Sequence, residues 1–149
     1  MLFPISNSSI QLLRERGLLD FDLRGVDNGV GLCPTCHVMF DRAADPAFVF
    51  IPTDIQFFIV KELQDRQKRR LDQQSGIQSQ RRMPSAAEYT QHLRSKAIIS
   101  PAAESGLYSR VFLQRYLLEE YGGELFECLK TPRHWHGAPF AAFNRAFLL

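Results

Sequence analysis

Apolar residues recur at helical spacing in several separate segments of the chain. A short helix is predicted within residues 5–20, with Ser8 or Ser9 as its N-terminal cap. A second helix is predicted to begin at Pro34, because the fixed φ of proline suits a first helical turn. The residues expected on the apolar side of this second helix are Val38, Met39 and Phe40.

The longest predicted helix follows Pro52 and has Thr53 or Asp54 as its cap. After it, residues 73–85 are rich in Gln and Ser and are predicted to form a mobile polar linker. The apolar stripe expected on this helix consists of Ile55, Phe58, Ile59 and Leu63.

Three more helices are predicted in the second half of the chain. Ser85 followed by Glu88 is a capping-box pattern, which predicts a helix reaching about Lys96. The segment Tyr108–Glu120 has an amphipathic helical pattern and is followed by two glycines. A last helix is expected over Ala141–Leu148, after a loop rich in turn residues.

Two segments have the character of short strands. Val30–Leu32 is an apolar run next to Asn28–Gly29, a dipeptide that favours a tight turn. Phe48–Ile51 is apolar throughout, as expected of a strand buried on both faces. Strands and helices together predict an α+β fold. Because 149 residues suffice for one domain but not for two ordinary ones, residues 1–149 are predicted to form a single domain.

Composition excludes some classes of protein. Hydrophobic residues make up 45% of the chain, so the chain is not disordered overall. The net charge of +2 does not by itself argue for a nucleic-acid partner. Three cysteines do not make a disulfide framework. No leader sequence and no apolar run of membrane-spanning length is evident, so we expect a soluble intracellular protein of the cytoplasm or nucleus.

The stretch Asn28–Asp41 resembles part of a known family. Its pattern Asn-Gly-x-x-Leu-Cys-x-x-Cys-His-x-x-Phe-Asp is similar to the second half of the HNH nuclease (ββα-metal) motif, in particular to the fungal HNH nuclease-like branch. The segment Phe48–Pro52 and the later parts of the chain also resemble that branch. The resemblance implies a ββα-metal core within residues 1–52 and a mostly helical extension over residues 53–149, packed as one domain.

By this resemblance, Asn28 would orient a catalytic loop and His37 would bind a divalent metal ion (Mg²⁺, Mn²⁺ or Zn²⁺). The first His of the family, its general base, falls in a His-x-x-Pro context that reads Met1-Leu2-Phe3-Pro4 here. A thioether cannot take a proton near neutral pH. Losing a general base typically costs about 10²- to 10⁴-fold in rate. The chain is therefore predicted to be an HNH-fold protein that is not a competent nuclease.

Three functions stay open for such a chain. The first is small-molecule chemistry on a reused fold, such as a cyclisation or isomerisation in a fungal secondary pathway, without a cofactor. The chain would be a metal-dependent DNA endonuclease if the protein extends upstream of Met1. It would otherwise be a module that binds nucleic acid or another protein. Its oligomeric state is left open.

The two residues assigned by resemblance also have structural explanations. Asn28 can be the first residue of an Asn-Gly turn, which needs no function. His37 can be a hydrogen-bonded structural residue, since one His makes only a fraction of a metal site.

Cys33 and Cys36 form half of a zinc knuckle. Cys128 with His134 and His136 would complete four ligands only if the fold brings the tail to the motif. Read as Cys-x-x-Cys-His, the same residues match a c-type haem attachment site, but no export leader accompanies them. A thioredoxin-like pair would need a βαβ setting, so two small buried thiols are the simplest account.

The tail contains a group of His and aromatic residues that would line a pocket for a small apolar molecule. The alternative is a packed turn with a buried Trp and no binding function. The residues of this group are His134, Trp135, His136, Phe140 and Phe143.

Basic residues are concentrated in one part of the chain. Lys61–Lys96 contains nine of the 18 Lys and Arg residues and only four of the 16 acidic residues. Such an excess would give nucleic acid a set of phosphate contacts, or it would simply be a solvated helix end. The nucleic-acid candidates are Lys68, Arg69, Arg70, Arg81 and Arg82.

Overall fold

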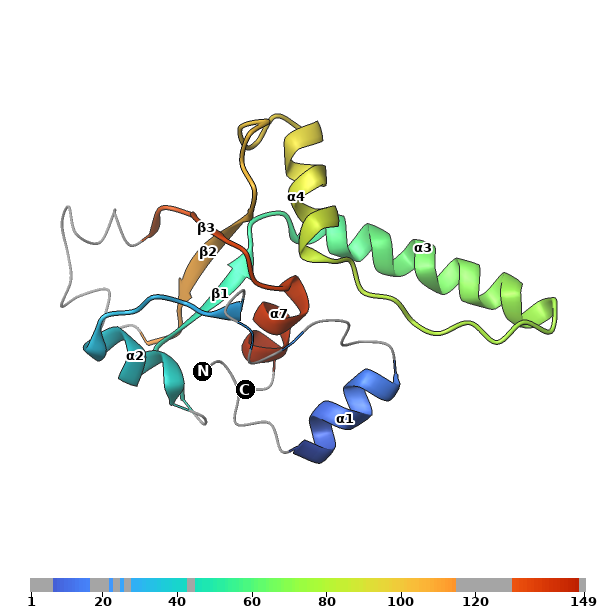
Figure 1. Cartoon of the computed structure of the whole chain (residues 1–149), viewed down its shortest axis with the longest axis horizontal. Coiled ribbons are helices and arrows are strands. Elements are labelled where there is room, and N and C mark those ends of the chain that lie inside the picture. The colour runs from blue at the N-terminus through green and yellow to red at the C-terminus, as the bar shows by residue number, and fades with distance from the viewer. Residues whose placement is uncertain are drawn as a thin grey trace.

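A three-stranded antiparallel sheet forms the centre of the molecule, and helices lie around it (Figure 1). The fold is described for residues 7–16, 22, 25, 28–42, 45–114 and 130–147 of a computed structural model. The elements of these residues, in chain order, are α1 (Asn7–Glu15), α2 (Pro34–Asp41), β1 (Phe48–Pro52), α3 (Ile55–Gln74), α4 (Ala86–Ser95), β2 (Gly106–Phe112), β3 (Arg133–Trp135) and α7 (Pro139–Phe147). The predicted α+β class is confirmed.

The strands of the sheet come from distant parts of the sequence. β2 is the central strand, with β1 on one side and β3 on the other. In the pairing of β1 with β2, Phe48 is opposite Phe112 and Pro52 is opposite Tyr108. Gly106 of β2 is opposite Trp135 of β3. The chain passes through α3 and α4 between β1 and β2, so these two helices are attached at one end of the sheet.

The prediction of a helix over Tyr108–Glu120 is wrong for its described residues, because Gly106–Phe112 is the central strand. Residues 115–120 lie outside the described residues. Aromatic and β-branched residues suit a half-buried strand. This one pairs with β1 over Tyr108–Phe112 and with β3 over Gly106–Tyr108, which satisfies much of its backbone. A Cβ at Gly106 would lie 2.7 Å from Cδ1 of Tyr89, so the glycine also allows α4 to approach the strand.

Buried aromatic residues form two clusters. The helical cluster consists of Phe57, Phe58, Tyr89, Leu93, Ile99, Tyr108 and Ala142. The motif cluster consists of Phe40, Ala47 and Phe48. Trp135 packs against both clusters, and its ring meets that of Tyr108 edge-on at 5.0 Å between centroids. The two clusters are therefore joined into one core by a side chain of the short strand β3.

The first two helices fit the prediction in part. α1 begins at Asn7, so Ser8 and Ser9 lie inside the helix instead of capping it. α2 begins at Pro34 as predicted, and Phe40 is its buried residue. Val38 is 62% exposed, so it does not belong to the buried side of α2. Val30–Leu32 forms no strand, although its residues are described.

α3 projects away from the sheet, and residues 75–85 run back beside it towards α4 (Figure 1). Asp54 caps the helix as predicted: its side chain accepts a hydrogen bond from the N–H of Phe57. The predicted apolar stripe is wrong except at Phe58, because the side of α3 that packs against α4 carries Phe57 and Phe58, whose rings meet that of Tyr89. The exposed members of that stripe are Ile55, Ile59 and Leu63, and the buried residue that the prediction missed is Phe57.

The two later helices agree with the sequence. Ser85 and Glu88 form the predicted capping box of α4, and Lys96 is its C-cap. α7 packs against β1, and it begins two residues before the predicted Ala141. Arg145 of α7 is buried and donates to the carbonyl of Arg42 at 2.8 Å and also to that of Phe40. Among the described residues, no helix combines the length and the apolar character needed to cross a membrane.

Candidate functional site

Asn28, the expected loop-orienting residue, connects two distant loops. Its side chain is buried, with the residue only 6% exposed. Nδ2 donates to the carbonyl of Asp22 at 2.7 Å, and Oδ1 accepts from the N–H of Ala138 at 3.0 Å. Both ends of the amide are thus used to hold the chain before α2 against the chain before α7. This arrangement differs from the hairpin turn considered for Asn28–Gly29, since residues 29–33 belong to no strand.

His37 lies on the exposed side of α2. Its Nε2 is 3.4 Å from Oδ2 of Asp41, one helical turn later, and the side chain is 54% exposed. No third His, Cys, Asp or Glu among the described residues joins this pair in a group that could hold a metal ion. Catalytic sites usually provide about three protein ligands. The described residues therefore do not fit a divalent ion at His37, and Met1, in the position of the family's first His, lies outside them.

The two cysteines of the motif occupy different environments at the start of α2. Cys33 is the N-cap residue and is exposed, so the expectation of two buried thiols is wrong for it. Cys36 is half-buried and packs against the motif cluster. Cys128, the third thiol of the proposed zinc set, lies outside the described residues. The described His134 and His136 form no metal-binding group with the cysteines.

The tail residues expected to line a pocket are used mainly for packing. Trp135 donates from Nε1 to the carbonyl of Gly29 at 2.9 Å. A Cβ at Gly137 would overlap the ring of Trp135, so this position requires glycine. His134 contacts the carbonyl of Ser105 through Nδ1 at 3.1 Å, and His136 is exposed.

Two hollows of the described residues, one between α3 and α4 and one at the far end of α3, are not lined by the tail aromatics. Phe143 instead meets Phe58 edge-on, with 4.9 Å between ring centroids, and Phe140 is half-buried. The larger hollow, of about 830 Å³, lies between α3 and α4. Its lining includes Phe57, Val60, Lys61, Glu88, His92 and Lys96.

One end of this hollow contains a group of charged side chains. Oδ2 of Asp54 is 2.7 Å from Nε2 of His92 and 3.4 Å from Nζ of Lys96. The hydrogen bond with His92 is the largest influence on the pKa of Asp54 and holds it below its usual value. The His92 ring also stacks on Phe57 at 4.3 Å between centroids. These contacts fasten α4 to the first turn of α3.

A carboxylate–imidazole pair can take part in catalysis when a nucleophile meets the second ring nitrogen. The hydroxyl of Ser95, one turn after His92, donates to the carbonyl of His92 at 2.7 Å. Its proton is therefore already committed to the helix backbone. Sequence reasoning identified Asp54 only as a cap and did not single out His92, which lies 38 positions away without any local signal.

Cations and carboxylates are distributed unevenly over the far part of α3 and the segment after it. We call residues 61–82 the basic arm. Arg69 is 2.7 Å from Asp65 and 3.6 Å from Glu62, and Arg81 is 2.9 Å from Glu62. Arg82 is 3.0 Å from Glu88 at the start of α4. Three of the five nucleic-acid candidates are thus held in ion pairs within the chain.

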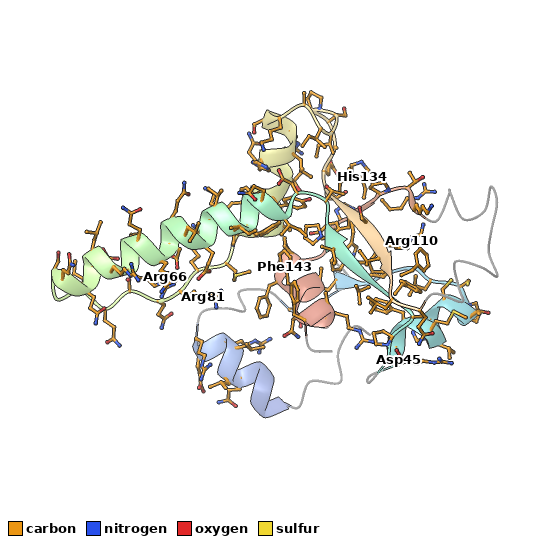
Figure 2. The ribbon with its side chains drawn as sticks, turned by 180° about the vertical axis from the view of Figure 1, so that it is seen from behind. Asp45, Arg66, Arg81, Arg110, His134 and Phe143 are labelled. Carbon is orange, nitrogen blue, oxygen red and sulfur yellow. The ribbon has the colours of Figure 1, made fainter. Side chains whose placement is uncertain are left out.

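The ion pairs determine how the arm is built. Through Glu62, Arg69 and Arg81, the segment after α3 is held against the helix; Figure 2 shows Arg81 on that segment beside Arg66 of the helix. The other cations of the far half of α3 are exposed and, among the described residues, belong to no ion pair. These cations are Arg66, Lys68 and Arg70.

Comparison with models of protein families, with curated proteins and with solved structures found no match. The resemblance to the HNH family therefore stays a prediction from the sequence.

Proposed function

We propose that this protein binds nucleic acid through the basic arm, by contacts to phosphates, and that it does not cut the strand it binds. The observation that carries the proposal is the state of Arg66, Lys68 and Arg70, three exposed cations on a helix that projects from the sheet. Phosphate contacts of this kind fix a protein on a nucleic acid without reading its sequence.

Local ion pairs occupy some of the cations of the arm and leave others unpaired. Two carboxylates of the arm, Glu62 and Asp65, are already neutralised by Arg69 and Arg81. Arg66 and Arg70 are four positions apart, so they lie on one side of the helix, about 6 Å apart along its axis. The arm therefore offers a polyanion three exposed cations, Arg66, Lys68 and Arg70, that form no ion pair within the described residues.

The distribution of charge over the whole chain supports the same function. Residues 61–96 contain nine basic and four acidic residues, and the rest of the chain contains nine basic and twelve acidic residues. A basic segment attached to an acidic remainder directs a polyanion to one region, although the net charge is only +2.

The test is the salt dependence of binding, measured by fluorescence anisotropy with a labelled DNA duplex and a labelled single-stranded RNA. The variant replaces Arg66, Lys68 and Arg70 by Gln. Each lost phosphate contact should make the negative slope of log K against log salt less steep by roughly 0.7 to 0.9. The slope of the triple variant should therefore be less steep by about two to three. Affinity at low salt should fall at least roughly tenfold.

A matched control carries the same number of Gln substitutions elsewhere, at Arg14, Arg16 and Arg133, which are exposed. The control should keep the slope and affinity of the unmodified protein. An equal loss in both triple variants would show non-specific attraction. That result, or no binding by the unmodified protein at low salt, would contradict the proposal.

The ββα-metal core remains a second proposal beside this one. It is supported by the resemblance of residues 28–41 and by the helix that carries His37 and begins at Pro34. Incubation with plasmid DNA and Mg²⁺, Mn²⁺ or Zn²⁺ should give no more cutting than the His37→Ala variant gives. Nicking that depends on His37 would favour the endonuclease alternative over a protein that only binds.

A role in small-molecule chemistry has less support. The aromatic residues expected to line its pocket, Trp135 and Phe143, pack into the core instead. Neither described hollow contains them. The hollow between α3 and α4 has a paired Asp54 and His92 but no free nucleophile beside them in the helix.

A further inference from the structure

Cys33 and Cys36 occupy the first turn of α2 with their sulfur atoms in unequal positions. Cys33 is the N-cap, in an extended conformation with φ −65° and ψ 159°. Its Sγ accepts a hydrogen bond from the N–H of Cys36, with 3.4 Å between N and Sγ. An N-cap acceptor at this place is normally an oxygen of Ser, Thr, Asp or Asn. Here a sulfur takes that role, and its anionic form is the better acceptor.

The two thiols also differ in their exposure to solvent. Cys33 is open to solvent, whereas Cys36 packs against the motif cluster beside Phe40 and Phe48. The hydrogen bond from the N–H of Cys36 lowers the pKa of Cys33. Burial raises the pKa of Cys36, and the neighbouring Cys33 raises it further. One thiol is thus accessible to solvent, while the other is partly covered by the motif cluster.

We propose that Cys33 and Cys36 form a dithiol site that exchanges with the disulfide bond of another molecule, with Cys33 as the attacking sulfur and Cys36 as the resolving sulfur. The βαβ setting of other Cys-x-x-Cys proteins is absent from the described residues here. Exchange nevertheless depends on the thiolate, its access and a second thiol nearby, and the first turn of a helix provides all three.

Both steps of the exchange balance without any further reactant. The Cys33 thiolate attacks one sulfur of the substrate disulfide, whose S–S bond breaks and whose other sulfur leaves as a thiolate that takes up a proton. A mixed disulfide between Cys33 and the substrate remains. Cys36 then loses its proton and attacks Cys33 Sγ, which releases the second substrate thiol and forms a Cys33–Cys36 disulfide. Two electrons pass from the protein to the substrate disulfide.

The same sulfur atoms would be zinc ligands if other groups completed the coordination. Among the described residues no third His, Cys, Asp or Glu does so, and His37, the next residue, pairs with Asp41 instead. A reversible dithiol needs only the two cysteines that the helix brings together. The proposal is independent of nucleic-acid binding, since the basic arm contains no cysteine.

The experiment uses the full chain with Cys128→Ser as background, so that only the two thiols of α2 report. The reduced protein is treated with oxidised glutathione, and the products are identified by intact mass and peptide mapping. We expect a Cys33–Cys36 disulfide, seen as the loss of two hydrogen atoms. In separate samples, alkylation by iodoacetamide near neutral pH should modify Cys33 at least about tenfold faster than Cys36, because the sulfur of Cys33 is exposed and that of Cys36 is partly covered.

Two variants separate the roles. Cys36→Ala keeps the backbone N–H that donates to Cys33, so rapid alkylation of Cys33 should persist, but the mixed disulfide with glutathione should now accumulate. Cys33→Ala should react slowly at its remaining thiol. Circular dichroism should show that both variants stay folded, since both keep Pro34 at the start of α2; Cys33→Ala also loses the N-cap acceptor, so its stability should be slightly lower.

Several results would overturn the proposal. Equal alkylation rates at the two cysteines would remove the distinction between attacking and resolving sulfurs. Failure of the folded protein to form the Cys33–Cys36 disulfide with oxidised glutathione would show that the thiols are inert. Stoichiometric binding of Zn²⁺ that protects both cysteines from alkylation would identify a metal site instead.

Discussion

The sheet with its two aromatic clusters and the basic arm are built on opposite principles. In the clusters, side chains such as Tyr89 and Phe48 are 0% and 3% exposed and pack ring against ring. On the arm, Leu63 and Leu71 are 59% and 56% exposed. The arm is held by ion pairs around Glu62, which contribute about 0–1 kcal/mol each when exposed.

This difference separates the stability of the molecule from its proposed binding. Burial of apolar area in the clusters stabilises the fold, and the arm adds little of it. Substitutions in the clusters should therefore lower the free energy of unfolding, whereas substitutions on the arm should change only what the surface binds. The loss of unfolding free energy should therefore decrease from the clusters, through the contacts between loops, to the cap of α3.

The largest effect is expected from Phe48→Ala, which removes a ring packed against Phe40, Phe50 and Phe112. The cavity and lost burial should lower the free energy of unfolding by about 3–5 kcal/mol. The matched change on the arm, Leu63→Ala, should cost less than roughly 0.5 kcal/mol, because the side chain is already largely in water. Urea denaturation followed by circular dichroism measures both values. Equal losses would show that the arm packs against something in solution.

An intermediate effect is expected from Asn28→Ala. The substitution leaves the N–H of Ala138 without its partner and removes one of the two hydrogen bonds to the carbonyl of Asp22, which keeps the bond from the N–H of Gly25 at 3.1 Å; the cost should be about 1–3 kcal/mol. Asn28→Asp keeps an acceptor for Ala138 but places a carboxylate oxygen against the carbonyl of Asp22 at a buried position, so near neutral pH it should cost at least as much as Asn28→Ala. A change in nucleic-acid affinity without a change in unfolding free energy would contradict this structural role.

The smallest effect depends on pH. Asp54→Ala removes the cap of α3 and should cost about 1 kcal/mol near neutral pH. Because the pKa of Asp54 is lowered in the folded state by its hydrogen bond with His92, its stabilisation is present above the unfolded value of about 3.9. It should disappear as the pH falls through the folded pKa. Unfolding free energies of both proteins between about pH 3 and pH 7 would test this, and a constant difference would contradict it.

The local signals in the sequence identified the helices well. Pro34, Asp54 and the Ser85–Glu88 pair each determine a helix start through their own backbone or side chain, and the structure has these starts. α7 was also predicted, from its place after a loop rich in turn residues, although it begins two residues earlier than expected. These helix starts depend on neighbouring residues alone, so they can be predicted without the rest of the chain.

The failures concern positions whose state depends on distant partners. β2 has residues that satisfy a helical pattern, yet pairing with β1 and β3 decides its conformation. The stripe on α3 was misplaced because the spacing of apolar residues does not show which side and which turns of a helix pack against the core. In the site, the pairing of His92 with Asp54 and the exposure of Cys33 follow only from the folded arrangement.

The hydrogen bonds that reach the N-terminal motif from the tail have a consequence for synthesis. Ala138 bonds to Asn28 across 110 positions, Trp135 to Gly29 across 106, and Arg145 to Phe40 across 105. During synthesis on the ribosome, residues 28–40 therefore cannot form all of these hydrogen bonds until residue 145 has been translated. Until then Cys36 and the aromatic rings of this segment lack part of their native packing, so this part of the core is among the last to form during synthesis.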